Sequence, residues 1–157
     1  MYLISNLELL ITLFQSSFYL KINDTTLEKD EFMTLIRAGE SETLDFKQTI
    51  TAQKIARTLV AFANAKGGTI LVGVSDKKHL LGIDIAEESY VIEEAANKYC
   101  VPPVEIVLEE YEEDDKSILV VQVKESLNKN HQAQDAHDKW HLYIRMGDKN
   151  IALSKLS

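Results

Sequence analysis

Cysteine is almost absent from this sequence. Cys100 is the only one among 157 residues, so no disulfide can form within the chain and nothing in the composition requires an oxidising compartment. We therefore expect a reduced, buried thiol and a cytoplasmic protein. Glycine and proline are scarce as well, with six and two residues, and no repeat or low-complexity tract is present. The length and the 45% hydrophobic content predict one domain around a single core.

A long uninterrupted apolar run is also missing. The amino end, "MYLISNLELLITLFQSSFYLK", is apolar, but it lacks a basic start, carries Glu8 and is broken by Gln15 and two serines. It predicts an amphipathic helix over residues 1–24 that packs on the domain or on a second copy of the chain in a homo-oligomer. One domain over residues 25–157 should follow. No membrane partner is expected.

Positive charge is in short supply overall. The net charge of −8 argues against a nucleic-acid partner, because phosphate binding needs a positive surface. The acidic excess lies entirely in the second half, since residues 1–80 hold nine basic and nine acidic side chains. Between positions 45 and 79 two acids face six bases, which are Lys47, Lys54, Arg57, Lys66, Lys77 and Lys78. This segment is either a solvated basic face or a phosphate-binding surface.

Hydrophobic periodicity predicts the order of the elements. Helices are expected over residues 25–39, 50–64 and about 86–99, the last with Asp84 and Glu87 placed to cap it. Strands are expected over 43–47 and 69–74, in a hairpin over 104–125, and over 141–146, with a short strand near "LLGI". The polar stretch 126–140 predicts a long loop that is functional or poorly ordered. The resulting fold class is α/β (α+β), a mixed β-sheet with flanking helices.

Three acids could meet at one edge of this sheet. Asp45 lies in the first core strand, Glu40 precedes it, and Asp76 follows the next strand. If a helical crossover makes these strands neighbours, the carboxylates could share Mg²⁺ or Mn²⁺, with Lys47 orienting water or a phosphate. Two alternatives stay open. The "DFK" pattern also suits any amphipathic strand, and an aspartate in the position of Asp76 often caps a turn.

Other chemistries find little support. His137 and His141 are four residues apart, but no third ligand completes a zinc site. The "KGG" of residues 66–68 lacks P-loop spacing and precedes a strand rather than following one, and no G-x-S-x-G elbow is present. Nucleotide binding through a P-loop and nucleophilic catalysis are therefore disfavoured. Gly67 and Gly68 instead predict a tight turn.

Four segments together closely resemble the Schlafen-type Alba-like domain, a family described as DNA-binding. They are "ESETLDFKQ", "KIARTLVAFANAKGGTILVGVSD", the following "LGI", and "YIRMGDKN", and the resemblance extends over roughly residues 35–152. It implies a mixed α/β domain with a nucleic-acid role in a regulator or defence protein. Whether the nucleic acid is DNA or RNA stays open.

The resemblance also implies roles for individual residues. In Schlafen endoribonucleases three acids and a lysine occupy the positions of Glu40, Asp45, Asp76 and Lys47, with glutamate where this chain has Asp45. Arg145 matches an arginine that contacts phosphate or forms an ion pair. The leading hypothesis is nucleic-acid binding through Lys47, Lys54, Arg57, Lys77, Lys78 and Arg145. The alternatives are a divalent-metal-dependent endoribonuclease using the three acids, and an ATP-binding or non-catalytic oligomerisation module.

Overall fold

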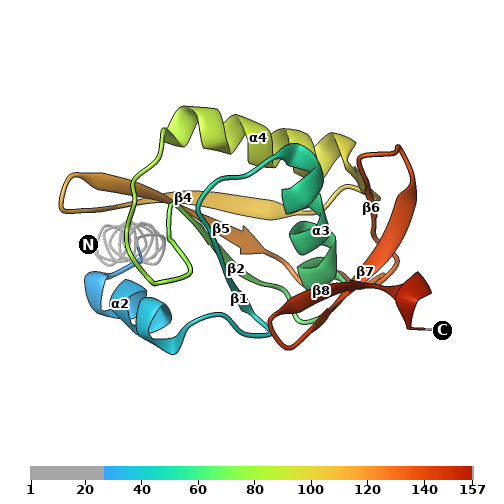
Figure 1. Cartoon of the computed structure of the whole chain (residues 1–157), viewed down its shortest axis with the longest axis horizontal. Helices are drawn as coiled ribbons and strands as arrows, with labels where there is room; N and C mark the ends of the chain where they lie inside the picture. Colours follow the sequence, from blue (N-terminus) through green and yellow to red (C-terminus); the bar gives the residue numbers. More distant parts are fainter. Residues whose placement is uncertain (1–26, 157) are drawn as a thin grey trace, which may run out of the picture.

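The computed structural model describes residues 27–156, so the predicted helix over 1–24 lies outside the described residues (Figure 1). The chain is an α+β domain with three α-helices and eight strands in this part. The elements in chain order are α2 (Lys29–Ala38), β1 (Leu44–Lys47), α3 (Ala52–Ala63), β2 (Gly68–Val72), α4 (Ile85–Lys98), β3 (Cys100–Val101), β4 (Ile106–Glu113), β5 (Lys116–Val123), β6 (Gln132–Gln134), β7 (Trp140–Met146), β8 (Lys149–Ala152) and the 3₁₀ turn η1 (Leu153–Lys155).

The strands form two sheets rather than one. The first has the order β1-β2-β5-β4, with β1 and β2 parallel and the other pairs antiparallel. The second has the order β3-β6-β7-β8 and is antiparallel throughout. The predicted crossover is confirmed, because α3 joins the parallel neighbours β1 and β2. The predicted hairpin is also confirmed as β4 and β5.

Helix α3 connects the two sheets through a common core (Figure 1). Its buried side chains pack with α4, with the β2 and β5 side chains that face them, and with Ala133, Tyr143 and Ala152 of the second sheet. On the opposite face of the first sheet, α2 packs Phe32 and Ile36 against a second core cluster. Each face of the first sheet is therefore covered, and α3 fixes how the second sheet meets the first.

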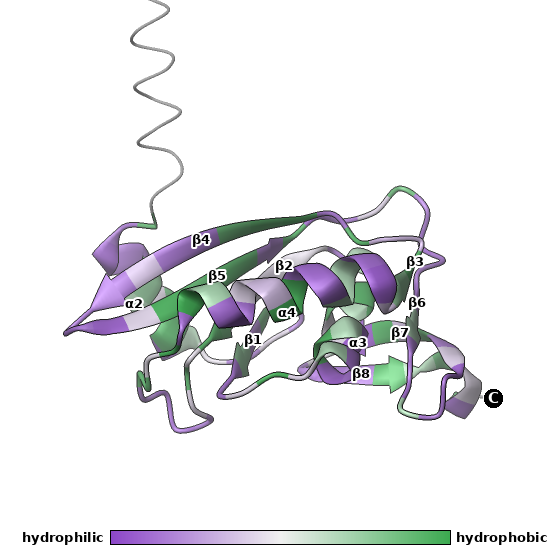
Figure 2. Ribbon diagram, turned by 90° about the horizontal axis from the view of Figure 1, so that it is seen from above, coloured by the Kyte–Doolittle hydropathy of each residue, from purple (hydrophilic) through white to green (hydrophobic). Residues whose placement is uncertain are grey.

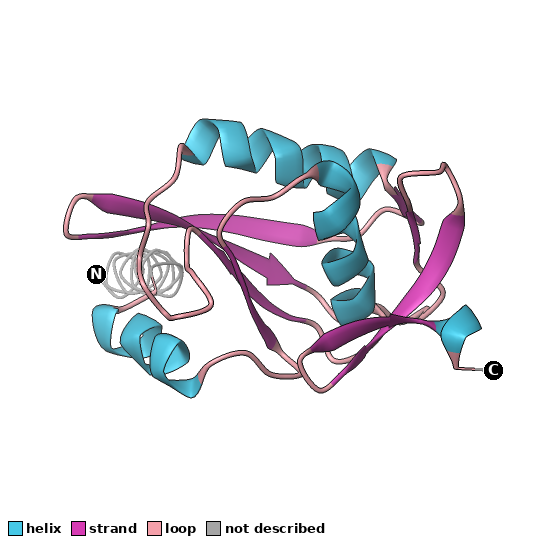
Figure 3. Ribbon diagram, in the orientation of Figure 1, coloured by secondary structure: helices cyan, strands magenta, loops and turns pink. Residues whose placement is uncertain are grey.

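Local patterning accounts for several boundaries. The Asp84 side chain accepts a hydrogen bond from the Glu87 amide at 3.0 Å, which confirms the predicted cap of α4. Gly67 has φ +72°, and a Cβ there would stand 2.6 Å from the Val123 carbonyl oxygen, so only glycine fits this turn. The hairpin β4–β5 is hydrophilic at its turn and hydrophobic farther along, where α4 runs over it (Figures 2 and 3).

The interpretation of residues 126–140 as one polar loop was wrong. The segment contains β6, which pairs with both β3 and β7. Asn64 anchors it, because its amide donates to the carbonyl oxygens of His131 and Tyr143 at 2.9 Å each, and its own oxygen accepts from the His131 amide at 3.0 Å. Local polarity gave no indication of this side-chain clamp, which joins residues far apart in sequence.

Two smaller expectations also needed correction. The segment around "LLGI" forms one isolated bridge, between Val74 and Leu80, instead of a strand. The stretch after β7, read from sequence as a turn, continues into the further strand β8, which pairs with β7. Within residues 27–156 no helix is long and apolar enough to cross a membrane.

Candidate functional site

The first core strand carries Asp45 and Lys47 on the side facing α3, and Leu44 and Phe46 on the side facing α2, as its alternation predicts. Asp45 is 3% exposed. One carboxylate oxygen, Oδ1, accepts a hydrogen bond from Arg145 Nη2 at 3.1 Å, and the other, Oδ2, contacts the Lys47 ammonium. Both oxygens of this buried acid therefore face protein cations.

Arg145 is held from several sides. Its Nη2 also donates to the carbonyl oxygen of Ser41 at 2.9 Å, its Nη1 donates to Asn150 Oδ1 at 2.8 Å, and its guanidinium carbon lies 4.8 Å from the Phe62 ring centroid. Only 7% of the residue is exposed. Of the two roles that sequence suggested, phosphate contact or ion pair, the structure has the ion pair. Arg145 ties β7 of the second sheet to β1 of the first.

The other two predicted acids form no ion pair with Arg145 or Lys47. Glu40 Oε1 accepts a hydrogen bond from the Phe46 amide at 2.9 Å. Asp76 is exposed in the turn after β2, where the Ser75 hydroxyl, rather than Asp76, accepts from the His79 amide at 3.1 Å. In the part of the chain that the structure describes, no three acidic, histidine or cysteine side chains are placed to hold a metal ion.

The three carboxylates therefore do not fit a shared Mg²⁺ or Mn²⁺ as the residues stand. Asp45 would have to exchange Arg145 or Lys47 for the ion, whereas Glu40 uses only one oxygen, Oε1, for its bond to the Phe46 amide. Loss of either partner would leave a cation or a donor without its acceptor in a largely buried place. The arrangement is suited to joining the two sheets.

Beside this junction lies a pocket of about 410 Å³ with a strongly one-sided charge. Four of its lining residues are basic, and we call them the cationic pocket: Lys47, Lys54, Arg57 and Lys149. No acidic side chain lines it; the other lining residues are Thr58, Asn150 and Ile151. On a chain with a net charge of −8, such a concentration of positive charge is a local feature of the site.

The fold explains why these bases meet. Lys54 and Arg57 are three residues apart on α3, which places them on one side of the helix. Lys149 begins β8, and the Asn150 side chain beside it donates to the Thr58 hydroxyl at 2.8 Å, which holds β8 against α3. Sequence reasoning found the first two but missed Lys149, because β8 was taken for a turn.

Three of the four bases carry uncompensated charge. Within residues 27–156, no acid forms an ion pair with Lys54, Arg57 or Lys149, whereas Lys47 is paired with Asp45. Arg57 Nε is buried and has no hydrogen-bond partner among the described residues. A buried donor without an acceptor is costly, so Arg57 differs in this respect from Arg145, whose donors have acceptors in the protein.

A second pocket, of about 520 Å³, shares Arg57, Asn150 and Ile151 with the first. We call it the histidine pocket after its lining residue His141, whose Nε2 lies 2.8 Å from Asp135 Oδ2. The pKa of Asp135 is lowered to about 2, first by the Lys139 amide and then by His141 and the His137 amide. Sequence reasoning missed this pair: Asp135 lay within the polar segment 126–140, and His141 was considered only as a zinc ligand together with His137.

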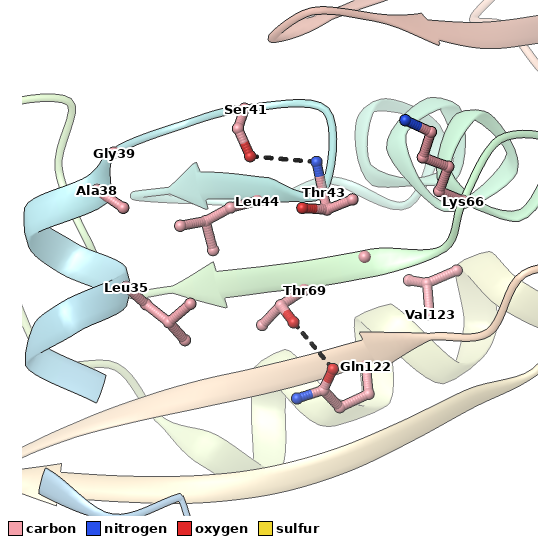
Figure 4. A pocket seen from close by; sticks show the side chains of 11 residues that line it. Leu35, Ala38, Gly39, Ser41, Thr43, Leu44, Lys66, Thr69, Gln122 and Val123 are labelled. Carbon is pink, nitrogen blue, oxygen red and sulfur yellow. Dashed lines mark hydrogen bonds between the residues drawn. The ribbon is translucent and has the colours of Figure 1, made fainter. Parts of the chain in front are cut away.

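The remaining predicted bases are elsewhere. Lys77 is exposed in the turn after β2, and Lys78 Nζ donates to the Arg37 carbonyl oxygen at 3.0 Å. Neither lines the cationic pocket. Another pocket, of about 390 Å³, lies between α2, β1, β2 and β5 (Figure 4). Its only charged lining residue is Lys66, which pairs with Glu42 at 3.0 Å, so it offers an anion little free charge.

Cys100 is buried, as expected from the sequence. Burial raises the pKa of its thiol to about 12. Because the thiolate is the reactive form, this shift disfavours nucleophilic chemistry by Cys100 at neutral pH.

Comparisons with known proteins identify a matching family and similar solved structures. The family described as Schlafen, AlbA_2 matches residues 40–154. The DIP2311 protein from Corynebacterium diphtheriae shares the fold at 20% identity and a TM-score of 0.50, over 71% of this chain and 25% of that one. The N-terminal domain of an ATP-dependent DNA helicase RecG-related protein from Nitrosomonas europaea is 18% identical, with a TM-score of 0.49 over 59% of this chain and 71% of that one.

The chain spans only a quarter of the length of the C. diphtheriae protein, and no curated protein matches it. The family match extends over most of the described residues and includes β1, the glycine turn before β2, and the β7–β8 hairpin with Arg145. The chain therefore belongs to the Schlafen AlbA_2 family.

Proposed function

We propose that this domain binds nucleic acid through the cationic pocket. The observation that carries the proposal is the set of three bases, Lys54, Arg57 and Lys149, that share one pocket with no acid in its lining and no ion-pair partner in the described chain. Phosphate diesters supply closely spaced single negative charges, and such bases bind them with release of counterions. Family membership supports the same class of ligand.

The lining also contains groups that suit a sugar–phosphate backbone. Arg57 presents a planar guanidinium, which can donate two parallel hydrogen bonds to one phosphate. Thr58 and Asn150, which also line the pocket, form a hydrogen bond with each other at 2.8 Å. Contacts of this kind bind the backbone and carry little sequence information, so we expect binding with weak sequence preference.

The metal-dependent endoribonuclease has less support. Its three acids are Glu40, Asp45 and Asp76, and the only one of them in the buried core has both oxygens against cations. The oligomerisation alternative depends on residues 1–24, which lie outside the described residues, and ATP binding has no favouring observation.

A binding titration tests the proposal. Fluorescently labelled single-stranded RNA, single-stranded DNA and duplex DNA are titrated with the full chain, and then with the triple variant Lys54→Gln, Arg57→Gln, Lys149→Gln. We expect the variant to lose roughly 10- to 100-fold in affinity for each ligand that the wild type binds. The control is Lys77→Gln with Lys78→Gln, which removes two positive charges outside the pocket, against three in the triple variant.

Two outcomes would contradict the proposal. One is a wild-type chain that binds none of the three nucleic acids at low salt. The other is a triple variant that binds as well as the wild type while the control pair loses affinity, which would place the binding surface at the turn after β2.

A further inference from the structure

Strand β7 has its apolar side turned away from the rest of the described domain (Figure 1). Tyr143 and Arg145 face α3, the one α-helix that packs on the second sheet in residues 27–156, and both are buried. Successive side chains of a strand alternate between faces, so the opposite side carries four apolar residues: Trp140, Leu142, Ile144 and Met146. A sheet with one solvated face normally places its polar residues there, so β7 has the reverse pattern.

The neighbouring strands extend this apolar side into a surface. Paired residues of adjacent antiparallel strands share a face, so the register places Val101 and Gln132 beside Leu142, and Ile151 beside Ile144. We call this surface the outer face, and its residues are Val101 of β3, Gln132 and Gln134 of β6, Trp140, Leu142, Ile144 and Met146 of β7, and Lys149 and Ile151 of β8.

Charge on the outer face differs from charge on the chain as a whole. The chain has a net charge of −8, whereas the outer face has no acid and one base, Lys149, at its edge. Trp140, Met146 and Val101 remain 39%, 48% and 52% exposed. Exposed Trp and Met without acids are typical of the core of a protein–protein interface. A strongly charged partner, including nucleic acid, would find little complementary charge here.

A second copy of the chain fits this surface by charge. Two copies of an acidic chain repel each other over much of their surface, but two outer faces bring no acids together. The turns at the ends of β7 each carry one acid and one base, Asp138 with Lys139 and Asp148 with Lys149. In an antiparallel two-fold arrangement each turn meets the opposite turn of the copy, so every acid has a base to face.

The size of the outer face predicts the strength of such an interface. Seven residues of β7 span about 24 Å, and four strands are at most about 19 Å wide. Two such faces in contact would bury on the order of 1,000 Å² in total, which is near the lower limit for a specific interface. A dimer of this size should dissociate in the micromolar range rather than the nanomolar range.

We propose that the outer face is the interface of a homodimer, in which two copies pack sheet against sheet around a two-fold axis. Trp140 and Met146 supply the largest exposed apolar side chains of β7 to it. The inference goes beyond nucleic-acid binding and does not depend on it. Because Lys149 also lines the cationic pocket, the dimer has one such pocket beside each edge of its interface.

Sedimentation velocity of the full chain, over a concentration series across the micromolar range, tests the inference. We expect a reversible equilibrium between monomer and dimer for the wild type. Trp140→Glu and Val101→Glu each place an acid against the partner copy, and each should raise the dimer dissociation constant at least about 10-fold. Trp140→Phe keeps an aromatic anchor and should stay within about threefold of the wild type.

The matched control is Val107→Glu, because Val107 is 57% exposed and lies in β4 of the first sheet. It makes the same change of charge outside the outer face and should leave the dimer intact. Both sites on the outer face are already well exposed in the monomer, so thermal melting of the three glutamate variants at a concentration where all are monomeric should agree within a few degrees.

Four results would overturn the inference. The wild type could stay monomeric over the whole series, or Trp140→Glu and Val101→Glu could form dimers as the wild type does. Val107→Glu could dissociate the dimer as strongly as they do. Finally, Leu10→Lys with Phe14→Lys could abolish the dimer while the outer-face variants keep it, which would place the interface in residues 1–24. None of these results bears on binding through the cationic pocket, so the two proposals fail separately.

Discussion

Arg145 and Arg57 lie in the same region, where α3 meets the second sheet, and they differ in almost everything except residue type. Both guanidinium groups lie over aromatic rings, Phe62 for Arg145 and Tyr143 for Arg57. Arg145 is buried and has protein acceptors on several sides, including Asp45. Arg57 is half-buried, has no acid partner in the described chain, and leaves its Nε without an acceptor.

The difference shows how to separate a structural cation from one available to a ligand. Positive charge in the sequence does not distinguish the two, because both arginines belong to segments that resemble the family. The distinction lies in whether the protein itself supplies the acceptors. Where it does, the charge stabilises the fold, and where it does not, the remaining hydrogen-bonding capacity is available to phosphate.

The largest effect is expected from breaking the buried pair. Arg145→Met leaves Asp45 buried with one of its two cations removed, so we expect a loss of roughly 3 to 5 kcal/mol in the free energy of unfolding. Urea denaturation measures it. Adding Asp45→Asn to this variant should recover part of the loss. If Arg145→Met were as stable as the wild type but bound nucleic acid more weakly, Arg145 would be a ligand-binding residue rather than a structural one.

Asn150 lies between the two arginine environments and should give an intermediate effect. It accepts from Arg145 Nη1 and donates to the Thr58 hydroxyl, each at 2.8 Å. Asn150→Ala removes both bonds, and we expect a loss of about 1 to 3 kcal/mol in the free energy of unfolding. An Asn150→Ala chain as stable as the wild type would mean that β8 is not held to α3 by this side chain.

Strong acid should weaken the contacts that Asp135 makes in the histidine pocket. The pKa of Asp135 is lowered from its ordinary value of 3.8 to about 2, so its charged form stabilises the folded state. That contribution is complete above the ordinary value and is lost as the pH falls through about 2. The melting temperatures of the wild type and Asp135→Asn should therefore differ most near pH 5 and converge toward pH 2. A constant difference in melting temperature across this range would show that ionisation of Asp135 does not stabilise the fold.

The smallest effect on stability is expected from substitution of Arg57, which has no acid partner in the described chain. Arg57→Gln removes no ion pair, so the free energy of unfolding should change by no more than about 0.5 kcal/mol. Lys54→Gln is the matched change on the same face of α3. A loss as large as that of Arg145→Met would show that Arg57 is a structural residue and would remove it from the proposed binding surface.

Short-range pattern predicted much of this architecture. Alternation in "ETLDFKQ" placed Asp45 and Lys47 on one face, and the apolar stripe of residues 50–64 placed Lys54 and Arg57 together on the polar side of α3. The crossover made β1 and β2 parallel neighbours. These features follow from the periods of helix and strand, which a sequence displays directly.

The parts that sequence missed depend on contacts between distant residues. The partner of Asp45 is 100 residues away in Arg145, and nothing near "DFK" indicates that a guanidinium, rather than a metal ion, would meet the carboxylate. Asn64 turns a polar segment into β6 through contacts 67 and 79 residues away. Lys149 joined the pocket only because β8 pairs with β7.

Salt dependence tests the central claim most directly, because it counts the phosphate contacts made by the cationic pocket. The slope of log affinity against log salt is measured for the wild type and for the Lys54→Gln, Arg57→Gln, Lys149→Gln variant on single-stranded RNA. Each phosphate contact contributes about 0.7 to this slope, so we expect the variant's slope to be shallower by roughly 2. Equal slopes for the two proteins would contradict the account, because they would mean that these three charges meet no phosphate.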